Sequence, residues 1–430
     1  MEGQRQAAQR HSGDPRTAAI TALAKWLRTQ MFPDRLLADG QGQALEITYG
    51  VIRNKTALEH VVSKFCRKPP SPLPRAALLA GAWQLLFADG IPDYAAISET
   101  VDAARSVHAG SPGFVNAVLR AILRSRDALC AELAAAPLSL RASHPEEIVQ
   151  RWTTVFGGEA AADICAADNL VPATTAVALP FSDAAKTAGL LARWKAAGID
   201  AAFSDANPAA ITIPHGVRIE TLPGFSEGAF IIQDPATLQS LRLLAPKPGE
   251  SILDACAAPG GKAMQLAASV GKTGRVFAFD ASVHRLGRLR ANAARTGFGD
   301  VISCGEADAT TPAVAAELRG AVPDAILADV PCSNSGVFRR RPDARWRWTP
   351  GETTRLATLQ LAILTNLATL GAGRLVYSTC SIDPEEDEDV VRRFLESPSG
   401  TRYQLADEVK TLPSPASDGS YAALLLARQA

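Results

Sequence analysis

The sequence predicts two kinds of fold in one chain: an all-helical N-terminal domain and a C-terminal α/β domain with a doubly wound, mostly parallel sheet. The chain has 430 residues, 47% of them hydrophobic, which is more than one core usually organises. Apolar residues recur at helical spacing in the first third, whereas strands alternate with helices after Glu250. We expect domains at residues 1–130 and 246–430, joined by an α+β subdomain at 131–245.

The N-terminal third carries apolar residues three and four positions apart between short Pro, Gly and Asp breaks. This pattern predicts helices at residues 18–30, 43–65, 75–87, 94–107 and 113–123. Residues 1–130 hold 16 Lys and Arg against 11 Asp and Glu, while the whole chain has no net charge. The excess of positive charge could meet an anionic partner such as RNA, although ordinary surface variation also explains it.

The middle segment mixes short strand-like and helix-like runs. TTAVALPF, AAITIP and GAFIIQD resemble strands, and EEIVQRWTTVF and AAKTAGLLARWKAAG resemble helices. From SILDAC onward, the strands VFAFD, VISC, DAILAD and RLVYST alternate with helical runs. Such repetition favours a parallel sheet with right-handed crossovers, whose ligands bind outside the carboxyl ends of the strands.

Acidic residues and a glycine-rich turn, Pro259-Gly260-Gly261, follow the strands at that edge. The turn lets the backbone approach a ligand, and the helix that begins near Lys262 offers free amide groups. Neither GxxxxGK[ST] nor GxGxxG is present in the turn, which disfavours a P-loop and a dinucleotide site. A nucleoside ligand without pyrophosphate remains, and S-adenosylmethionine is the common one. The residues at this edge that suit such a ligand are Pro259, Gly260, Gly261, Lys262, Asp280, Asp308 and Asp329.

Seven cysteines are scattered without a CxxC pair, which suggests free thiols in a reducing, cytoplasmic compartment and neither a disulfide framework nor a metal site. Cys332 and Cys380 differ from the others because both follow strands at the ligand-binding edge. A thiolate at this edge suits methyl transfer to carbon 5 of a pyrimidine. Carbon 5 of a pyrimidine becomes nucleophilic only after a group adds to carbon 6, and a cysteine can do this. Asp329 could then hydrogen-bond the ring's N3 side, and a second thiol could assist release.

A basic segment, SGVFRRRPDARWRWTP, follows Cys332. Arginine binds phosphates as a fork, and arginine and tryptophan stack on unpaired bases, so the segment is a candidate RNA contact. The expected RNA-binding residues are Arg339, Arg340, Arg341 and Arg345. A basic loop that packs its tryptophans inward is the alternative.

Three motifs in this order resemble those of the RNA 5-methylcytosine methyltransferases of the RsmB/Sun type. They are DACAAPGGK at 254–262, DVPCSNSG at 329–336 with FRRRPDARW behind it, and YSTCSIDPEEDEDVV at 377–391. The N-terminal segment, with GSPGFVNAVLR at 110–120, is similar to the NusB-like RNA-binding domain of the members that act on small-subunit rRNA. SHPEEIVQRW and FIIQDPATLQ extend the resemblance over nearly the whole chain.

The resemblance implies a Rossmann-like class I methyltransferase domain that uses S-adenosylmethionine. The cofactor-binding residues that it implies are Cys256, Ala257, Ala258, Pro259, Gly260, Gly261, Lys262, Asp280, Asp308 and Asp329. It also implies that Cys380 is the nucleophile and that Cys332 assists product release, a ranking that the residues alone leave open. Asp329 and Lys262 complete the expected catalytic set. The turn NSG stands where GTG is common, Ala263 follows the motif lysine, and EEDED replaces an expected Glu-Glu-Asn-Glu.

The expected substrate is small-subunit rRNA or a ribosome assembly intermediate, handled by a monomer with no membrane association. A tRNA substrate is the alternative within the enzyme class, and a non-catalytic RNA-binding assembly factor is the alternative outside it. A nicotinamide oxidoreductase is disfavoured by the missing GxGxxG.

Overall fold

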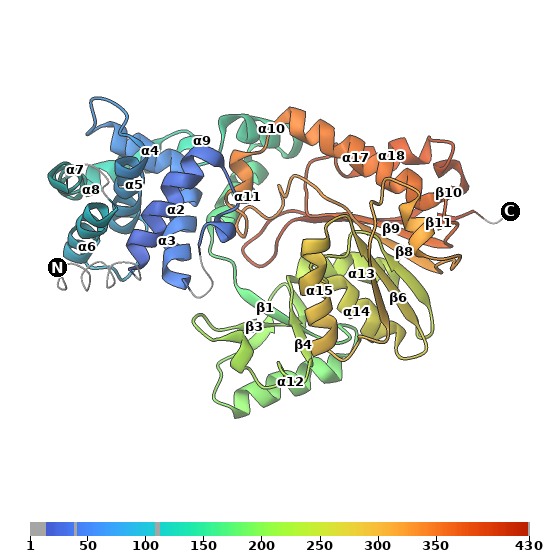
Figure 1. The fold of residues 1–430 in the computed structure, drawn as a ribbon. Coiled ribbons are helices and arrows are strands. Elements are labelled where there is room, and N and C mark those ends of the chain that lie inside the picture. The colour runs from blue at the N-terminus through green and yellow to red at the C-terminus, as the bar shows by residue number, and fades with distance from the viewer. Residues whose placement is uncertain (1–13, 38–40, 108–111, 429–430) are drawn as a thin grey trace. The chain divides into compact units, whose positions relative to one another are not determined.

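The computed structural model describes residues 14–37, 41–107 and 112–428, and the chain divides into two compact units (Figure 1). The first unit contains the chain up to Leu170 together with Phe338–Arg347, and the second contains Val171–Val337 and Trp348–Ala430. The expected domain boundary at residue 130 lies inside a helix, and the helices that follow it up to residue 170 belong to the first unit.

The first unit is helical, with the short 3-10 turns η1 (Pro33–Arg35) and η4 (Ala344–Trp346). Helix α5 lies at its centre because ten consecutive residues, 76–85, are buried. The helix expected at 43–65 is broken at Asn54, whose backbone leaves the helical range. The helices are α2 (Pro15–Thr29), α3 (Gly42–Arg53), α4 (Lys55–Ser63), α5 (Pro72–Leu86), α6 (Asp93–Ser106), α7 (Pro112–Arg124), α8 (Arg126–Ala135), α9 (Leu138–Arg141), α10 (Glu146–Phe156) and α11 (Gly158–Asn169).

One of the quoted motifs extends beyond the described residues, because residues 110 and 111 of GSPGFVNAVLR lie outside them. The rest of GSPGFVNAVLR forms α7, whose valine and leucine side chains enter the core of the first unit.

The second unit begins with a small antiparallel sheet in the order β2-β3-β1-β4. Its elements are β1 (Thr174–Ala178), α12 (Ala184–Ala196), β2 (Ala202–Ser204), β3 (Asn207–Ile213), the 3-10 turn η2 (Ile219–Thr221), β4 (Phe230–Ile232), the turn η3 (Pro235–Thr237) and α13 (Leu238–Leu244). The three strand-like runs of the middle segment thus form β1, β3 and β4. Helix α12 packs its Trp194 against this sheet, in contact with the Phe230 ring.

The large sheet of the second unit has the order β10-β11-β9-β8-β5-β6-β7. The strands from β9 to β7 in this order are parallel, and β11 and β10 add antiparallel at one edge. Its elements are β5 (Ser251–Asp254), α14 (Gly261–Val270), β6 (Arg275–Asp280), α15 (Val283–Arg295), β7 (Ile302–Glu306), α16 (Ala313–Glu317), β8 (Ala325–Asp329), α17 (Pro350–Ala368), β9 (Arg374–Thr379), α18 (Glu388–Leu395), the 3-10 turn η5 (Gly400–Arg402), β10 (Tyr403–Thr411) and β11 (Ser420–Ala427).

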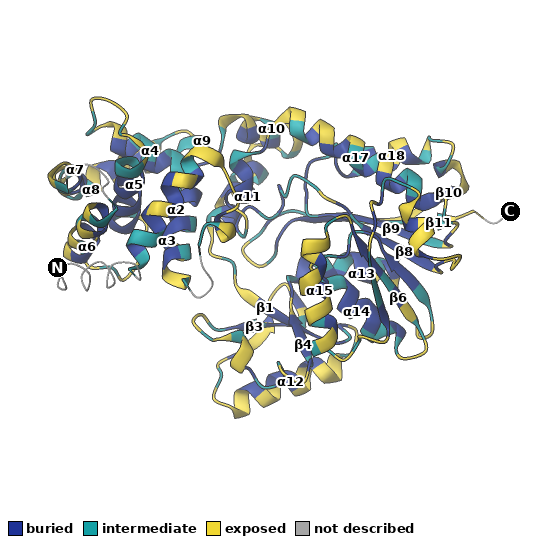
Figure 2. Ribbon diagram, in the orientation of Figure 1, coloured by how far each residue is buried: buried dark blue, intermediate teal, exposed yellow. Residues whose placement is uncertain are grey.

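Helices cover both faces of this sheet. Helices α13, α14 and α15 share one core with it, and α16, α17 and α18 share the other (Figure 1). Figure 2 shows the sheet buried between them, with exposed residues on the outer sides of α12 and α15. The strand order reverses between β5 and β8, and a doubly wound sheet binds its ligands at such a point.

Candidate active site

The turn after β5 brings the backbone close to the adjacent helix. Gly260 has a φ of +108°, and a Cβ there would lie 2.9 Å from Cγ of Leu289. Only glycine fits this position without strain, because L side chains rarely adopt positive φ. Helix α14 begins at the next residue, so its first-turn N–H groups, which the helix itself leaves unbonded, point out of the carboxyl edge of the sheet.

Asp254, the last residue of β5, is a buried acid to which no side chain donates a hydrogen bond. The residue is 1% exposed, neither carboxylate oxygen has a well-formed hydrogen bond, and only the nearby backbone N–H of Cys256 favours its charged form. Burial, reinforced by the negative charge of Asp329, raises the pKa of Asp254 to about 8. Lys262 opposes this shift. An unpaired carboxyl group of this kind is costly unless a ligand supplies the donor.

Asp280 and Asp308 follow the next two strands as expected. Asp280 is buried and accepts hydrogen bonds from the backbone N–H groups of Ala258 (3.3 Å) and Ser282 (2.9 Å) and from the Arg285 guanidinium (2.7 Å). Asp308 is exposed, and one of its oxygens accepts from the amide and hydroxyl of Thr310. Asp280 therefore braces the glycine turn, while Asp308 keeps a carboxylate oxygen toward solvent.

Lys262 and Asp329 form an ion pair between α14 and the end of β8. Nζ of Lys262 lies 2.5 Å from Oδ1 of Asp329, and the Lys262 side chain is 12% exposed. Ser378, at the end of β9, donates to the same oxygen at 2.8 Å. The Asp329 side chain stays 36% exposed, so part of its carboxylate remains open to a bound base.

The two cysteines that follow β8 and β9 are in contact. Their Sγ atoms lie 3.1 Å apart, and both residues are half-buried. The hydrogen bond with Cys380 and burial, together with the charge of Glu386, raise the pKa of the Cys332 thiol well above its ordinary value. The Cys332 thiol therefore holds its proton more firmly than a free thiol does.

Asn334 contacts both the turn that carries Cys332 and the turn that carries Cys380. Its φ of +64° is in the left-handed region that asparagine tolerates. Its Nδ2 donates to the Cys332 carbonyl at 3.0 Å, which turns Oδ1 toward Cys380, whose Sγ donates to it at 3.4 Å. Asn334 stands in the NSG turn, so its side chain contacts the candidate nucleophile where a glycine would have none.

Burial raises the pKa values of four of the other cysteines. Burial raises the pKa of Cys165 to about 12 and also raises the pKa values of Cys66 and Cys304. Cys256, in the glycine turn, likewise has its pKa raised by burial, with the charge of Asp254 adding to the effect. These thiols are poorly suited to form the thiolate that covalent chemistry requires.

The structure does not favour the expected RNA contact for Arg345. This side chain is wholly buried in the first unit, where burial lowers its pKa to about 10. Its guanidinium donates to the Asp168 carbonyl and the Asn169 side chain, both at 3.0 Å. A guanidinium that is wholly buried, with both terminal nitrogens bonded to the first unit, has no face left for a phosphate. Arg339 is also buried, at 3% exposure, whereas the side chain of Arg341 is 45% exposed and pairs with Asp34.

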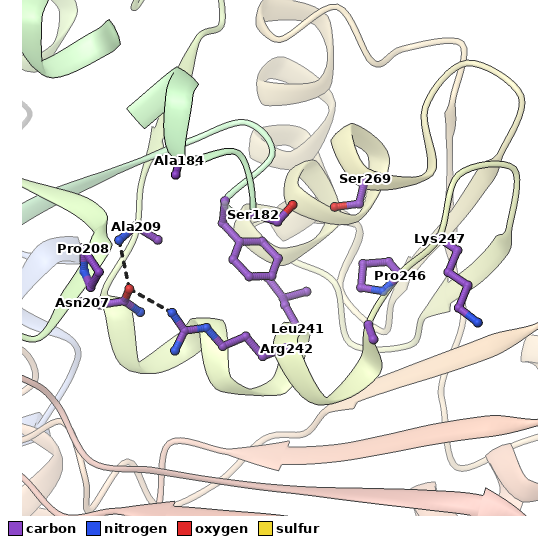
Figure 3. Close-up of a pocket in the computed structure, with 12 residues that line it drawn as sticks. Ser182, Ala184, Asn207, Pro208, Ala209, Leu241, Arg242, Pro246, Lys247 and Ser269 are labelled. Carbon is purple, nitrogen blue, oxygen red and sulfur yellow. Dashed lines mark hydrogen bonds between the residues drawn. The ribbon is translucent and has the colours of Figure 1, made fainter. Parts of the chain in front are cut away.

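A cavity of about 630 Å³ lies elsewhere in the second unit (Figure 3). Phe181 and Leu241 line it, and Arg242 at its wall donates to Oδ1 of Asn207 at 2.9 Å. None of the expected site residues lines this cavity. Size alone does not identify the site, because the acids and thiols gather at the carboxyl edge of the large sheet.

Sequence reasoning missed four residues that shape this edge: Asp254, Asn334, Ser378 and Glu386. All four lie within the quoted motifs, so their positions were visible, but their contacts depend on which strands are neighbours. Glu386 is fully buried and bonds to both thiol turns.

The fold and the site together define a methyltransferase domain of Rossmann-like fold joined to a helical domain. Residues 241–417 match the model of the 16S rRNA methyltransferase RsmB/F family, and residues 14–124 match the NusB family. The chain is 34% identical over 403 residues to the probable ribosomal RNA small subunit methyltransferase B of Bacillus subtilis, covering 89% of this chain and 88% of that one. It is also 34% identical to the Pasteurella multocida ribosomal RNA small subunit methyltransferase B, covering 87% and 82%. The chain belongs to the RsmB/F family.

Solved structures agree on the fold. The crystal structure of PH0851 superposes with a TM-score of 0.74 at 23% identity, covering 96% of this chain and 99% of that one. A methyltransferase homologue from Pyrococcus horikoshii superposes with a TM-score of 0.57 at 24% identity, covering 68% of this chain and 98% of that one. Within the described part of the chain, no helix has both the length and the apolar character that spanning a membrane requires.

Proposed function

We propose that this chain methylates carbon 5 of a cytosine in small-subunit rRNA, with S-adenosylmethionine as methyl donor and Cys380 as the covalent nucleophile. The contact between the two thiols, 3.1 Å apart at the edge that also holds the Lys262–Asp329 pair, carries the proposal. Membership of the RsmB/F family and the names of the relatives support an rRNA substrate.

The residues at the edge of the sheet suit S-adenosylmethionine. Bound there, it supplies an electrophilic methyl group. The unpartnered carboxyl group of Asp254 matches its ammonium, and the first-turn amides of α14 match its carboxylate. Asp280 lies at the end of β6, where an acid can receive ribose hydroxyls. Asp308 has an oxygen free of its turn for a further donor.

The chemistry proceeds in two halves. In the first, a bond forms between Sγ of Cys380 and carbon 6 of the ring, and the ring electrons move toward N3. The thiol proton ends on the N3 side, where Asp329 can hydrogen-bond it and where Lys262 holds that carboxylate in place. Carbon 5 is then nucleophilic enough to take the methyl group.

In the second half, carbon 5 must lose its proton so that the bond from Cys380 to carbon 6 can break. We infer a relay: Cys332 takes the carbon 5 proton while its own proton passes to the departing sulfur of Cys380. Both thiols then carry one proton each, and the ring regains its double bond. The proton held on the N3 side leaves to solvent past Asp329, which is the one proton that the overall methyl transfer releases. The raised pKa of Cys332 supports this assignment, because a thiol that keeps its proton can donate it and its conjugate base is strong.

The test is methyl transfer from radiolabelled S-adenosylmethionine to small-subunit rRNA that lacks the modification, followed by denaturing protein gels. We expect Cys380→Ala to be inactive and Cys332→Ala to accumulate a covalent protein–RNA adduct. Cys130→Ala serves as the control because Cys130 is exposed in the first unit. Full labelling by Cys380→Ala would refute the covalent mechanism. Labelling of tRNA in place of rRNA would redirect the substrate, and no labelling of either RNA would favour an assembly factor.

A further inference from the structure

Glu386 is a buried acid placed between the turns that carry the two thiols. It lies just before α18 and has no exposed surface. Its carboxylate accepts from the backbone N–H of Ser333 at 2.9 Å, next to Cys332, and from the hydroxyl of Ser381 at 2.8 Å, next to Cys380. One side chain therefore binds the residue that follows each thiol.

Further hydrogen bonds hold Glu386 in this position. Nε2 of Gln360, from α17, donates to Glu386 at 2.9 Å and to the carbonyl of Pro331 at 2.9 Å. The Tyr377 hydroxyl donates to the backbone carbonyl of Glu386. These bonds fix the carboxylate against helix α17, strand β9 and the Pro-Cys turn at once.

The charge of Glu386 is expensive to bury. Burial raises its pKa, and the hydrogen bonds from Ser333, Ser381 and Gln360 oppose the shift. A buried carboxylate that accepts three donors holds them more strongly than a neutral acceptor does. An apolar residue would fill the same space at lower cost but could not join the two turns.

We propose that Glu386 is a positioning residue that holds the Cys332 and Cys380 turns at sulfur contact. Ser381 also contacts the hydroxyl of Ser335 at 3.0 Å, which in turn accepts from the Ile382 amide at 3.0 Å, so the turns share a polar layer beneath the thiols. Glu386 supplies the acceptor that the two turns share in that layer. The consequence for methyl transfer rests on the proposed function, whereas the geometric claim does not.

The geometric claim is tested by oxidation in the absence of RNA and cofactor. Diamide removes two electrons and two protons from a pair of thiols in contact, forming the S–S bond and the hydrazine. The rate of the Cys332–Cys380 disulfide, followed by mass spectrometry of the linked peptides, therefore measures how often the sulfurs meet. Far-ultraviolet circular dichroism and the unfolding midpoint of each variant show whether it is folded.

We expect Glu386→Ala to slow cross-linking by about tenfold or more, because the turns lose their common acceptor. Ser381→Ala, which cuts the bridge at one end and leaves the acid in place, should slow it less. Glu386→Gln should restore most of the rate, because its oxygen can keep the Ser333 bond while its NH₂ faces the Ser381 hydroxyl. Glu352→Gln, on the exposed first turn of α17, is the matched control.

Unchanged cross-linking in folded Glu386→Ala and Ser381→Ala would overturn the proposal. In methyl transfer, Glu386→Ala should accumulate the protein–RNA adduct as Cys332→Ala does, because release needs the second thiol in contact. Slow cross-linking in Glu386→Ala combined with a fully active Cys380→Ala would uphold the positioning role and reject the covalent mechanism. The positioning role of Glu386 and the covalent mechanism can therefore be refuted independently of each other.

Discussion

The variant Asp254→Asn is predicted to become more stable than the wild-type protein as the pH rises, when both are free of cofactor. It is also predicted to bind the cofactor more weakly. The carboxyl group is 1% exposed and unpartnered, and burial together with the charge of Asp329 raises its pKa from the ordinary 3.8 to about 8. Asparagine keeps the shape of the side chain and removes the charge. The comparison therefore isolates the cost of ionising a buried acid.

The direction follows from proton binding. The folded pKa lies above the unfolded value, so between about pH 4 and pH 8 the folded protein keeps a proton that the unfolded chain releases. Protonation thus stabilises the fold at low pH, and this stabilisation is lost as the pH rises through the folded pKa. At about 1.4 kcal/mol per pH unit, wild type should lose about 4 kcal/mol relative to Asp254→Asn between pH 5 and pH 8.

The assay is urea unfolding of cofactor-free protein at several pH values, with calorimetric titration of S-adenosylmethionine alongside. The free-energy difference between Asp254→Asn and wild type should grow between pH 5 and pH 8 and level off above. Asp407→Asn, an exposed acid on β10, should follow wild type throughout. A difference that stays constant to within about 0.5 kcal/mol would show that Asp254 has a partner when folded and would remove it from the cofactor argument.

Further substitutions test contacts that the structure shows. Asn334→Gly keeps the left-handed backbone and removes the oxygen that accepts from Sγ of Cys380, so alkylation of the Cys380 peptide at neutral pH should become about twofold to tenfold faster; an unchanged alkylation rate contradicts the contact. Arg345→Ala should lower the stability of the first unit by about 3–5 kcal/mol in chemical unfolding, whereas Arg341→Ala should cost less than about 1 kcal/mol. Gly336→Ala would put a Cβ 2.8 Å from the Cys380 carbonyl oxygen and should slow methyl transfer by about tenfold. Equal stabilities or an unslowed Gly336→Ala would show that these positions tolerate the change.

The strand–helix rhythm after Glu250 predicted β5 to β9 because buried parallel strands appear as short apolar runs in sequence. The antiparallel pair at the sheet edge escaped prediction. Strand β10 is mostly exposed and polar, and it pairs with β11 across a bulge between Leu405 and Asp407. β10 forms a strand because it pairs with β11. The sequence of β10 has no sustained alternation of apolar and polar residues that would predict this.

The positions of Asp280, Asp308 and Asp329 at the strand ends could be predicted from the sequence, whereas the burial of Arg345 could not. An acid at a strand end keeps its place at the sheet edge wherever the rest of the chain goes. The environment of Arg345 depends instead on carbonyl groups of Arg53, Ser143 and Asp168, which are distant in sequence. Sequence shows the charge of such a segment but not whether its partners are phosphates or buried backbone.

The two thiols meet because of both the sheet and the turns that leave it. Strands β8 and β9 are parallel neighbours in which Asp329 pairs with Ser378, so Cys332 and Cys380 follow adjacent strand ends. Neighbouring strands are about 4.8 Å apart, which brings the turns together but leaves the sulfurs free to diverge. The contact at 3.1 Å therefore requires bonds between the turns, and those of Glu386 and the Gly336 amide to the Cys380 carbonyl provide them. Because the proposed nucleophile and the proposed proton relay follow separate strands, loosening these bonds should impair product release more than cofactor binding.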